Sequence, residues 1–478
     1  MQSASRARSW SIQKRKSHQE GQALIYGLFV LMGGVAALFF LFNTGQLSSE
    51  KTKLVNTADA VAYSAGVMHA RTLNFEAYTN RAMLANTVAI AQLVSLASWV
   101  QYTDNLGTYG FAAEMPQFQL FSPSMQAAQS MGSSLKDALI DSKALEDLAT
   151  ASDDIIVKIL MNSQKIAYEG LVQARKEVMQ QVADANYLND GTVIVDDIPL
   201  TMNEFRNFSS RYTGDDRTRF ADISRISAKR DGFVNRRDWV LPATFPVGCF
   251  YRLDFLTRAG GTELIDFDQW KAVDTLETKT WSIDWWGNCD LSPTPAGWGA
   301  QTAAVANSSS YDWNPLHYGY SLAINTGATG VAQVTAGSDW DYSGIPSFYD
   351  LSDGVLNNKD GAEKNDPRLK FAIRLRRNIN QTVTSEGRSA IKSSPSPSHA
   401  LGLNAYQAKS AGGGELVAVG ASEVFFQRPD GDKENTYGRE LNKPTEIGSL
   451  FNPYWQVHLL NTDAYIPAAM ALQAAGTP

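Results

Sequence analysis

One serine of the sequence lies in a setting that resembles a catalytic nucleophile. Ser321 is the centre of the run Gly-Tyr-Ser-Leu-Ala at positions 319–323, one residue away from the Gly-x-Ser-x-Gly pattern of many hydrolases. That pattern works because a sharp turn from a strand into a helix exposes the serine hydroxyl. The next residues here are Ile-Asn-Thr-Gly, which are typical of a strand end or a turn. We therefore expect Ser321 to lie in a plain strand, without a catalytic role.

The other motifs that could bind a ligand are incomplete. The glycines at 412–414 lack the Gly-Lys-Ser/Thr of a phosphate-binding loop. The stretch 430–434 has too few spaced carboxylates for a calcium-binding loop and is typical of a solvated hairpin turn. The five histidines show no metal-ligand spacing, and two cysteines are too few for a four-cysteine zinc module. The sequence therefore predicts no catalytic residue, metal, cofactor or small-molecule substrate.

Charge is distributed unevenly along the chain. The first 20 residues carry five basic side chains and one acidic one, a net charge of +4. Because the whole chain has a net charge of −7, the other residues together carry −11. Binding to nucleic-acid phosphates requires a basic surface. The acidic body therefore argues against a nucleic-acid partner.

An uncharged apolar run, Ala23–Phe42, follows the basic residues. A helix of 20 residues is about 30 Å long, the thickness of the hydrocarbon core of a bilayer. The alternatives are a buried core helix, which would usually carry a polar stripe, and a cleaved secretory signal, which would need small residues just after the run. We interpret the run as a retained, single-pass membrane anchor at 21–44.

The flanks of this run predict its orientation. The basic residues at 6, 8, 14, 15 and 16 precede it, whereas residues 46–49 carry no charge. Positive charge stays on the cytoplasmic side, so the tail 1–20 is expected in the cytoplasm and the rest of the chain outside it. A disulfide persists in such a compartment, which makes Cys249 and Cys289 a candidate pair. The alternative is two separate buried thiols.

A narrow apolar stripe follows the anchor at seven-residue spacing, which marks one face of a helix. Its small members would allow a partner helix to approach closely. The partner is either another protein or, as we favour, later helices of this chain. The stripe comprises Leu47, Leu54, Ala58, Val61, Ala65, Met68 and Phe75.

These segments resemble the N-terminal part of the TadG-like pilus-assembly family. The resemblance rests on Gly-Gln-Ala-Leu at 21–24, which opens the apolar run, and on Asn-Thr-Ala-Asp-Ala-Val-Ala-Tyr-Ser-Ala-Gly at 56–66. The stretches 74–83 and 451–456 resemble segments of large family members. The resemblance implies a part in building or displaying a Tad-type (Flp) pilus at the bacterial inner membrane. It also implies that the partners are the lipid bilayer and other pilus-assembly or minor pilin proteins.

Two departures from related patterns carry predictions. Type IV prepilins are cleaved after a glycine and have glutamate at the fifth mature position, which here, counted from Gln22, is Tyr26. We therefore expect the basic tail to be retained. Some TadG-like proteins also carry an Asp-x-Ser-x-Ser metal motif, whereas residues 222–226 read Asp-Ile-Ser-Arg-Ile. No metal site is expected there.

The exported part is predicted to be α+β. Apolar residues at helical spacing over 130–187 indicate packed helices, with Asp153 as a cap, so 45–190 is expected to be a helical region. Alternation over 251–255 and 369–375 indicates strands, and Ala-Gly-Gly at 259–261 indicates a turn. Apolar residues at 193–195, 416–419 and 424–426 extend the pattern, so 191–478 is expected to be a mainly antiparallel β body. No residue range is long enough to be a certain linker.

Two features of this body have alternative interpretations. Seven of the eleven tryptophans fall between 270 and 340, as expected for the core of a loop-rich region or for an aromatic binding surface for glycans or proteins. The arginines at 374, 376 and 377 are expected on a solvated strand face. The sequence thus favours a non-enzymatic structural or assembly component, the alternative being a membrane-tethered exported hydrolase or a surface-binding adhesin.

Overall fold

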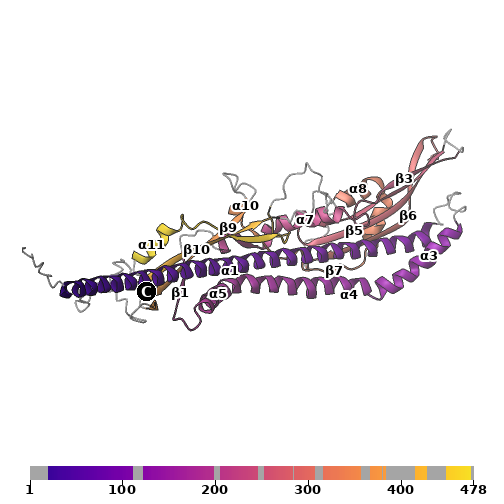
Figure 1. Ribbon diagram of the computed structural model, residues 1–478. Helices are drawn as coiled ribbons and strands as arrows, with labels where there is room; N and C mark the ends of the chain where they lie inside the picture. Colours follow the sequence, from indigo (N-terminus) through magenta and orange to yellow (C-terminus); the bar gives the residue numbers. More distant parts are fainter. Residues whose placement is uncertain are drawn as a thin grey trace, which may run out of the picture.

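A computed structural model of the chain describes residues 20–110, 122–198, 205–245, 252–283, 285–306, 316–356, 367–378, 381–383, 415–427 and 448–474. The molecule is elongated along one helix, with further helices on one side of that helix and β-sheets on the other (Figure 1). The predicted α+β class is confirmed.

The central helix, α1, runs without interruption from Glu20 to Tyr109. Its 90 residues contain no proline, and at 1.5 Å per residue they give a rod about 135 Å long. Gly45 and Gly66 do not break it. The apolar run and the predicted packing stripe are therefore parts of one helix.

The second helical layer follows α1 back along its length (Figure 1). It comprises α3 (Ser122–Lys136), a π-helical turn, α4 (Ala144–Thr150), a second π-helical turn (151–157) and α5 (Lys158–Asn186). The helices expected over 130–187 are thus confirmed, but the cap expected at Asp153 is wrong. Asp153 lies inside the second π-helical turn, where its buried carboxylate accepts a hydrogen bond from the backbone N–H of Ser343 at 2.7 Å.

Three sheets cover the other side of α1. A four-stranded antiparallel sheet has the order β1-β9-β10-β11, and a five-stranded sheet has the order β3-β4-β5-β6-β7, in which only β6 and β7 are parallel. The strands of the first are Ile194–Asp197, Arg368–Asn378, Glu415–Phe426 and Trp455–Leu459. Those of the second are Trp239–Phe245, Arg252–Ile265, Gln269–Ile283, Cys289–Ala304 and Trp340–Asp341. A two-stranded ribbon joins β2 (Ser209–Tyr212) to β8 (Phe348–Leu351).

Short helices complete the described part of the chain. Among them are α8 (Leu316–Ile324), α9 (Thr326–Thr335) and α11 (Ile466–Ala474). Helix α7 spans Thr218–Lys229, and α6 and α10 span Phe205–Phe208 and Asp353–Leu356.

Two further local predictions are wrong. The turn expected at 259–261 is the middle of β4, which continues to Ile265. A side chain at Gly260 would lie 2.3 Å from the carbonyl oxygen of Val273 in β5, so glycine permits a close strand approach there instead of a turn. Ser321 lies in helix α8 and not in a strand. The sequence could not decide between the two, because the periodicity of a short apolar run fits either structure.

The arginines of β9 do not form a solvated face. The side chains of Arg374, Arg376 and Arg377 are only 3%, 11% and 0% exposed, and each contacts carboxylates. Arg374 and Arg376 both bind Asp196 of β1 at 2.8 Å. The charges on this strand therefore join neighbouring elements.

Helix α1 supplies residues to each of the three largest apolar clusters. These clusters lie successively along it and include Leu54 and Val61, then Leu73, then Ile90. The core of the protein is thus a series of contacts arranged along α1, rather than one centre.

Candidate functional site

The first part of α1 has the length and composition of a membrane-crossing helix. Its most apolar window has a mean hydropathy of 2.4, and none of that window is buried within the protein. Large side chains such as Leu24 and Phe29 are 79% and 67% exposed. A signal sequence near an N-terminus shares these properties. The helix leaves the body at this end (Figure 1).

The predicted packing stripe lies partly on the buried face of α1. Leu54, Ala58, Val61 and Ala65 are fully buried. Leu47 and Met68 are partly buried, and Phe75 is 38% exposed. A seven-residue repeat drifts by about 20° per heptad on a straight helix, so the stripe rotates away from the body toward its ends.

The buried part of the stripe packs against this chain's own sheet as well as α5. A side chain at Gly420 of β10 would lie 2.2 Å from the carbonyl oxygen of Ala58. A side chain at Gly66 would lie 2.4 Å from Val457 of β11 and 2.9 Å from Ser422. Met179 of α5 belongs to the same apolar cluster as Ala58. The small residues therefore allow a helix to lie directly on a sheet.

Two segments noted in the sequence, 74–83 and 451–456, contact each other. The side-chain amide of Asn74 donates to the carbonyl of Trp455 and accepts from its N–H, both at 3.0 Å. The amide of Asn80 donates at 2.7 Å to the carbonyls of Leu450 and Tyr349. The sequence carried no signal for this pairing, because the bonded residues are 370 and 381 positions apart.

Titratable side chains are buried on the same stretch of α1. Burial raises the pKa of Glu76 to about 8, although a hydrogen bond from Ser209 at 3.2 Å opposes the shift. Burial and the neighbouring Arg175 guanidinium lower the pKa of His69 to about 3. Both groups are therefore uncharged in the folded protein at neutral pH.

Ion pairs tie the start of the body to α1. The fully buried guanidinium of Arg377 lies 3.1 Å from Glu50 and 3.4 Å from Asp190, and Lys53 lies 2.7 Å from Asp190. The ring of Tyr187 lies against both cations, 4.4 Å from the guanidinium carbon of Arg377 and 4.2 Å from Nζ of Lys53. This cluster was missed because its members come from three distant parts of the sequence.

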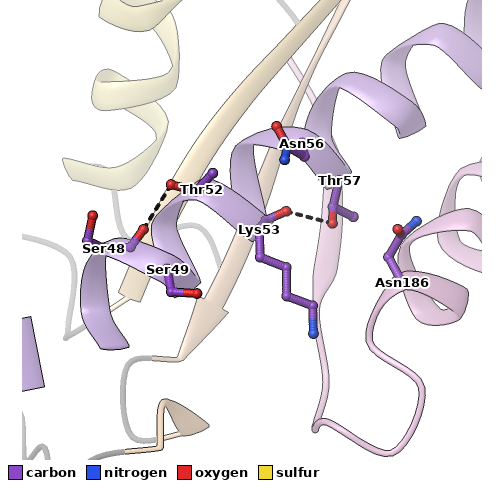
Figure 2. Close-up of a pocket in the computed structure, with 7 residues that line it drawn as sticks. All are labelled: Ser48, Ser49, Thr52, Lys53, Asn56, Thr57 and Asn186. Carbon is purple, nitrogen blue, oxygen red and sulfur yellow. Dashed lines mark hydrogen bonds between the residues drawn. The ribbon is translucent and has the colours of Figure 1, made fainter. Parts of the chain in front are cut away.

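A polar pocket of about 500 Å³ opens beside this cluster (Figure 2). Ser48, Thr52 and Asn56 form one row along α1, and the residues at 49, 53 and 57 form the next. Asn186 at the end of α5 faces them across the pocket (Figure 2). Among the described lining residues Lys53 alone is charged, and its ammonium pairs with Asp190. The hydroxyls of Thr52 and Thr57 donate to backbone carbonyls of α1, so they present lone pairs to the pocket.

Ser321 is not placed as a nucleophile. Its side chain is fully buried, and its hydroxyl lies 2.8 Å from those of Thr275 and Thr329. These contacts pack α8 and α9 against β5. A serine that opens a covalent reaction must reach its substrate.

The tryptophans divide between core and surface. Trp270, Trp298 and Trp340 are at most 8% exposed, whereas Trp285 and Trp286, between β5 and β6, are 95% and 84% exposed. The side chains at 281 and 313 lie outside the described residues. Some tryptophans of this segment therefore pack in the core, and others are exposed as a binding surface would require.

The predicted disulfide stays a prediction. Cys289 begins β6, and Cys249 lies outside the described residues. Among the residues that the structure describes, no group of three or more histidine, cysteine or acidic side chains is placed to hold a metal ion.

The comparison with known families agrees with the resemblance seen in the sequence. Residues 21–70 match the Tad family, described as Flp pilus-assembly TadE/G-like. The matched segment comprises the apolar run and the buried part of the stripe as far as Ala70, about a tenth of the chain. The predicted family resemblance is confirmed over this segment. No curated protein and no solved structure matches the chain.

Proposed function

We propose that this protein is a membrane-anchored, non-enzymatic structural component of a Tad-type (Flp) pilus-assembly apparatus. Its N-terminal tail lies in the cytoplasm, α1 crosses the bacterial inner membrane once, and the body lies in the periplasm or outside the cell. It acts by helix packing and by contacts with other pilus-assembly or minor pilin proteins.

The continuity of α1 is the main support for this proposal. The same helix contains the uncovered apolar run and then supplies the cores of the body from Leu54 to Val100. No loop intervenes between these two parts, so a displacement or rotation of the anchor is passed to the body without a hinge. Such coupling suits a component that links events in the membrane to an assembly outside it.

The charge distribution supports the orientation. The five basic residues before the apolar run favour a cytoplasmic N-terminus, and the family match begins where the run begins. The acidic body is suited to protein partners rather than to nucleic acid.

Affinity capture tests this function directly. Full-length tagged protein, solubilised from membranes in mild detergent, is expected to co-purify with other proteins of the pilus-assembly apparatus. Ala58→Glu should reduce this recovery, because an unpaired carboxylate at a fully buried position costs several kcal/mol.

Val55→Glu is the matched control. Val55 lies one helical turn before Ala58 but is 37% exposed, so the same new charge remains solvated there. Equal recovery of pilus-assembly proteins with both variants would contradict the role of the packing face. Capture of no pilus-assembly protein by the wild type, together with normal pili in a deletion strain, would overturn the proposed function.

A further inference from the structure

We propose that the C-terminal helix α11 lies on the surface of the bilayer, as a second membrane contact beside the anchor. The partner of this surface is the lipid of the leaflet on the body's side. The inference rests on the proposed insertion of α1.

Helix α11 is apolar except for Gln473. It reads Ile-Pro-Ala-Ala-Met-Ala-Leu-Gln-Ala, and no charged residue occurs over 465–478. A helix without a polar face is stable in water only where protein or lipid covers it. The composition therefore calls for a cover around most of the helix.

The protein supplies only part of that cover. Ala469 is buried in a small cluster with Ala372 of β9 and Ala421 of β10. Met470 and Ile466 are 63% and 40% exposed, and Pro467 and Ala471 are also exposed. One face of α11 is thus fixed to the sheet, and its opposite face carries uncovered apolar side chains.

The position of α11 identifies the cover. In Figure 1, α11 lies at the membrane end of the body, at the level along α1 where the apolar run gives way to the buried segment. An inserted α1 places the bilayer surface at that level. Apolar interfacial side chains enter the boundary between headgroups and acyl chains to a depth of about 5–10 Å. Exposed apolar residues at this place are expected to contact lipid.

Site-specific photo-crosslinking tests the contact. A photoreactive residue replaces Met470 in the full-length protein, which is reconstituted in vesicles of phosphatidylethanolamine and phosphatidylglycerol, and mass spectrometry identifies the adducts. Met131 is the matched control, because it is a methionine of α3, 49% exposed, at the far end of the molecule from the anchor (Figure 1). Lipid adducts at 470 should exceed those at 131 by about tenfold or more. Residue 470 would lie in the interfacial layer, where it can meet acyl chains, whereas residue 131 would lie far from the bilayer.

The apolar run supplies a second control. A photoreactive group at Leu31 reports the insertion of α1 itself. Lipid adducts at 31 but not at 470 would overturn the contact of α11 and leave the anchor in place. No lipid adduct at 31 would instead overturn the anchoring in the proposed function. Protein adducts in place of lipid at 470 would show that another protein covers the helix and would also overturn the inference.

Discussion

At the scale of single residues, α1 is unusual for the titratable groups that it buries. His69 and Glu76 are both fully buried, about two helical turns apart. The amide of Gln164 donates to the carbonyl of Glu76, and one carboxyl oxygen of Glu76 has no hydrogen-bond partner among the described residues. A protonated, uncharged carboxyl group fits these surroundings better than a carboxylate.

The pKa of Glu76, raised to about 8, predicts how stability depends on pH. Below pH 4.5 the side chain is protonated whether the chain is folded or unfolded, and burial carries no ionisation penalty. As the pH rises from 4.5 to 8, only the unfolded chain loses the proton, so the folded state loses stability, on the order of a few kcal/mol in total. Glu76→Gln should therefore raise the melting temperature at pH 8 and change it little at pH 5.

The control for this prediction is Glu177→Gln, at an exposed position of α5, which should leave the pH dependence unchanged. His69 affects stability at acidic pH. Its pKa is lowered to about 3, so the stability that its uncharged form contributes to the folded state is present above pH 6.5 and is lost as the pH falls toward 3. The same pH profile for Glu76→Gln as for the wild type would contradict a protonated Glu76.

At the scale of elements, close approach between α1 and the sheet depends on Gly66. Gly66→Leu should destabilise the body by about 1–3 kcal/mol or more, because the new side chain would overlap Val457 and Ser422. Gly170→Leu is the matched control, since that glycine also lies inside a helix but has nothing within 4 Å of the added carbon. There, better helix propensity should stabilise by up to about 1 kcal/mol.

Denaturant unfolding of both full-length variants in the same detergent gives the comparison. A loss of stability at both glycines would indicate a general effect of leucine in these helices and would contradict close packing at Gly66. A gain at both would show that the sheet can move away from α1.

The elements that the sequence predicted correctly are those with regular periodicity. Strand β9 alternates apolar and charged residues, and the helices over 130–187 show apolar residues at helical spacing. Prediction failed at positions where contacts between distant segments, and not the local pattern, characterise the structure. Gly260 lies inside β4, where β5 approaches it closely, and Ser321 lies in α8, which packs on β5 through buried hydroxyls. The Asn74–Trp455 and Arg377–Glu50 contacts join segments that no local pattern relates.

At the scale of the whole molecule, the boundaries drawn from the sequence at 44/45 and 190/191 fall inside a connected structure. Helix α1 runs across the first of them. Arg377 of β9, which lies beyond the second boundary, contacts Glu50 of α1 and Asp190, which both lie before it. The helical region and the β body therefore share their cores, and α1 belongs to both.

The fate of the N-terminal tail decides how the whole molecule works. Cleavage after Gly21 would remove the five basic residues that favour a cytoplasmic N-terminus, and would leave Gln22 to begin a helix able to leave the bilayer as a pilus subunit. Because Tyr26 stands where a prepilin has glutamate, we expect the tail to be retained.

The mass of the intact protein from membranes should then include residues 1–21. Tyr26→Phe, which keeps the aromatic ring, should give the same terminus as the wild type, whereas Tyr26→Glu restores the recognition residue and should allow cleavage by a prepilin peptidase. A wild-type terminus at Gln22 would show that Tyr26 does not prevent processing, and the protein would then be a candidate pilus subunit rather than a fixed anchor.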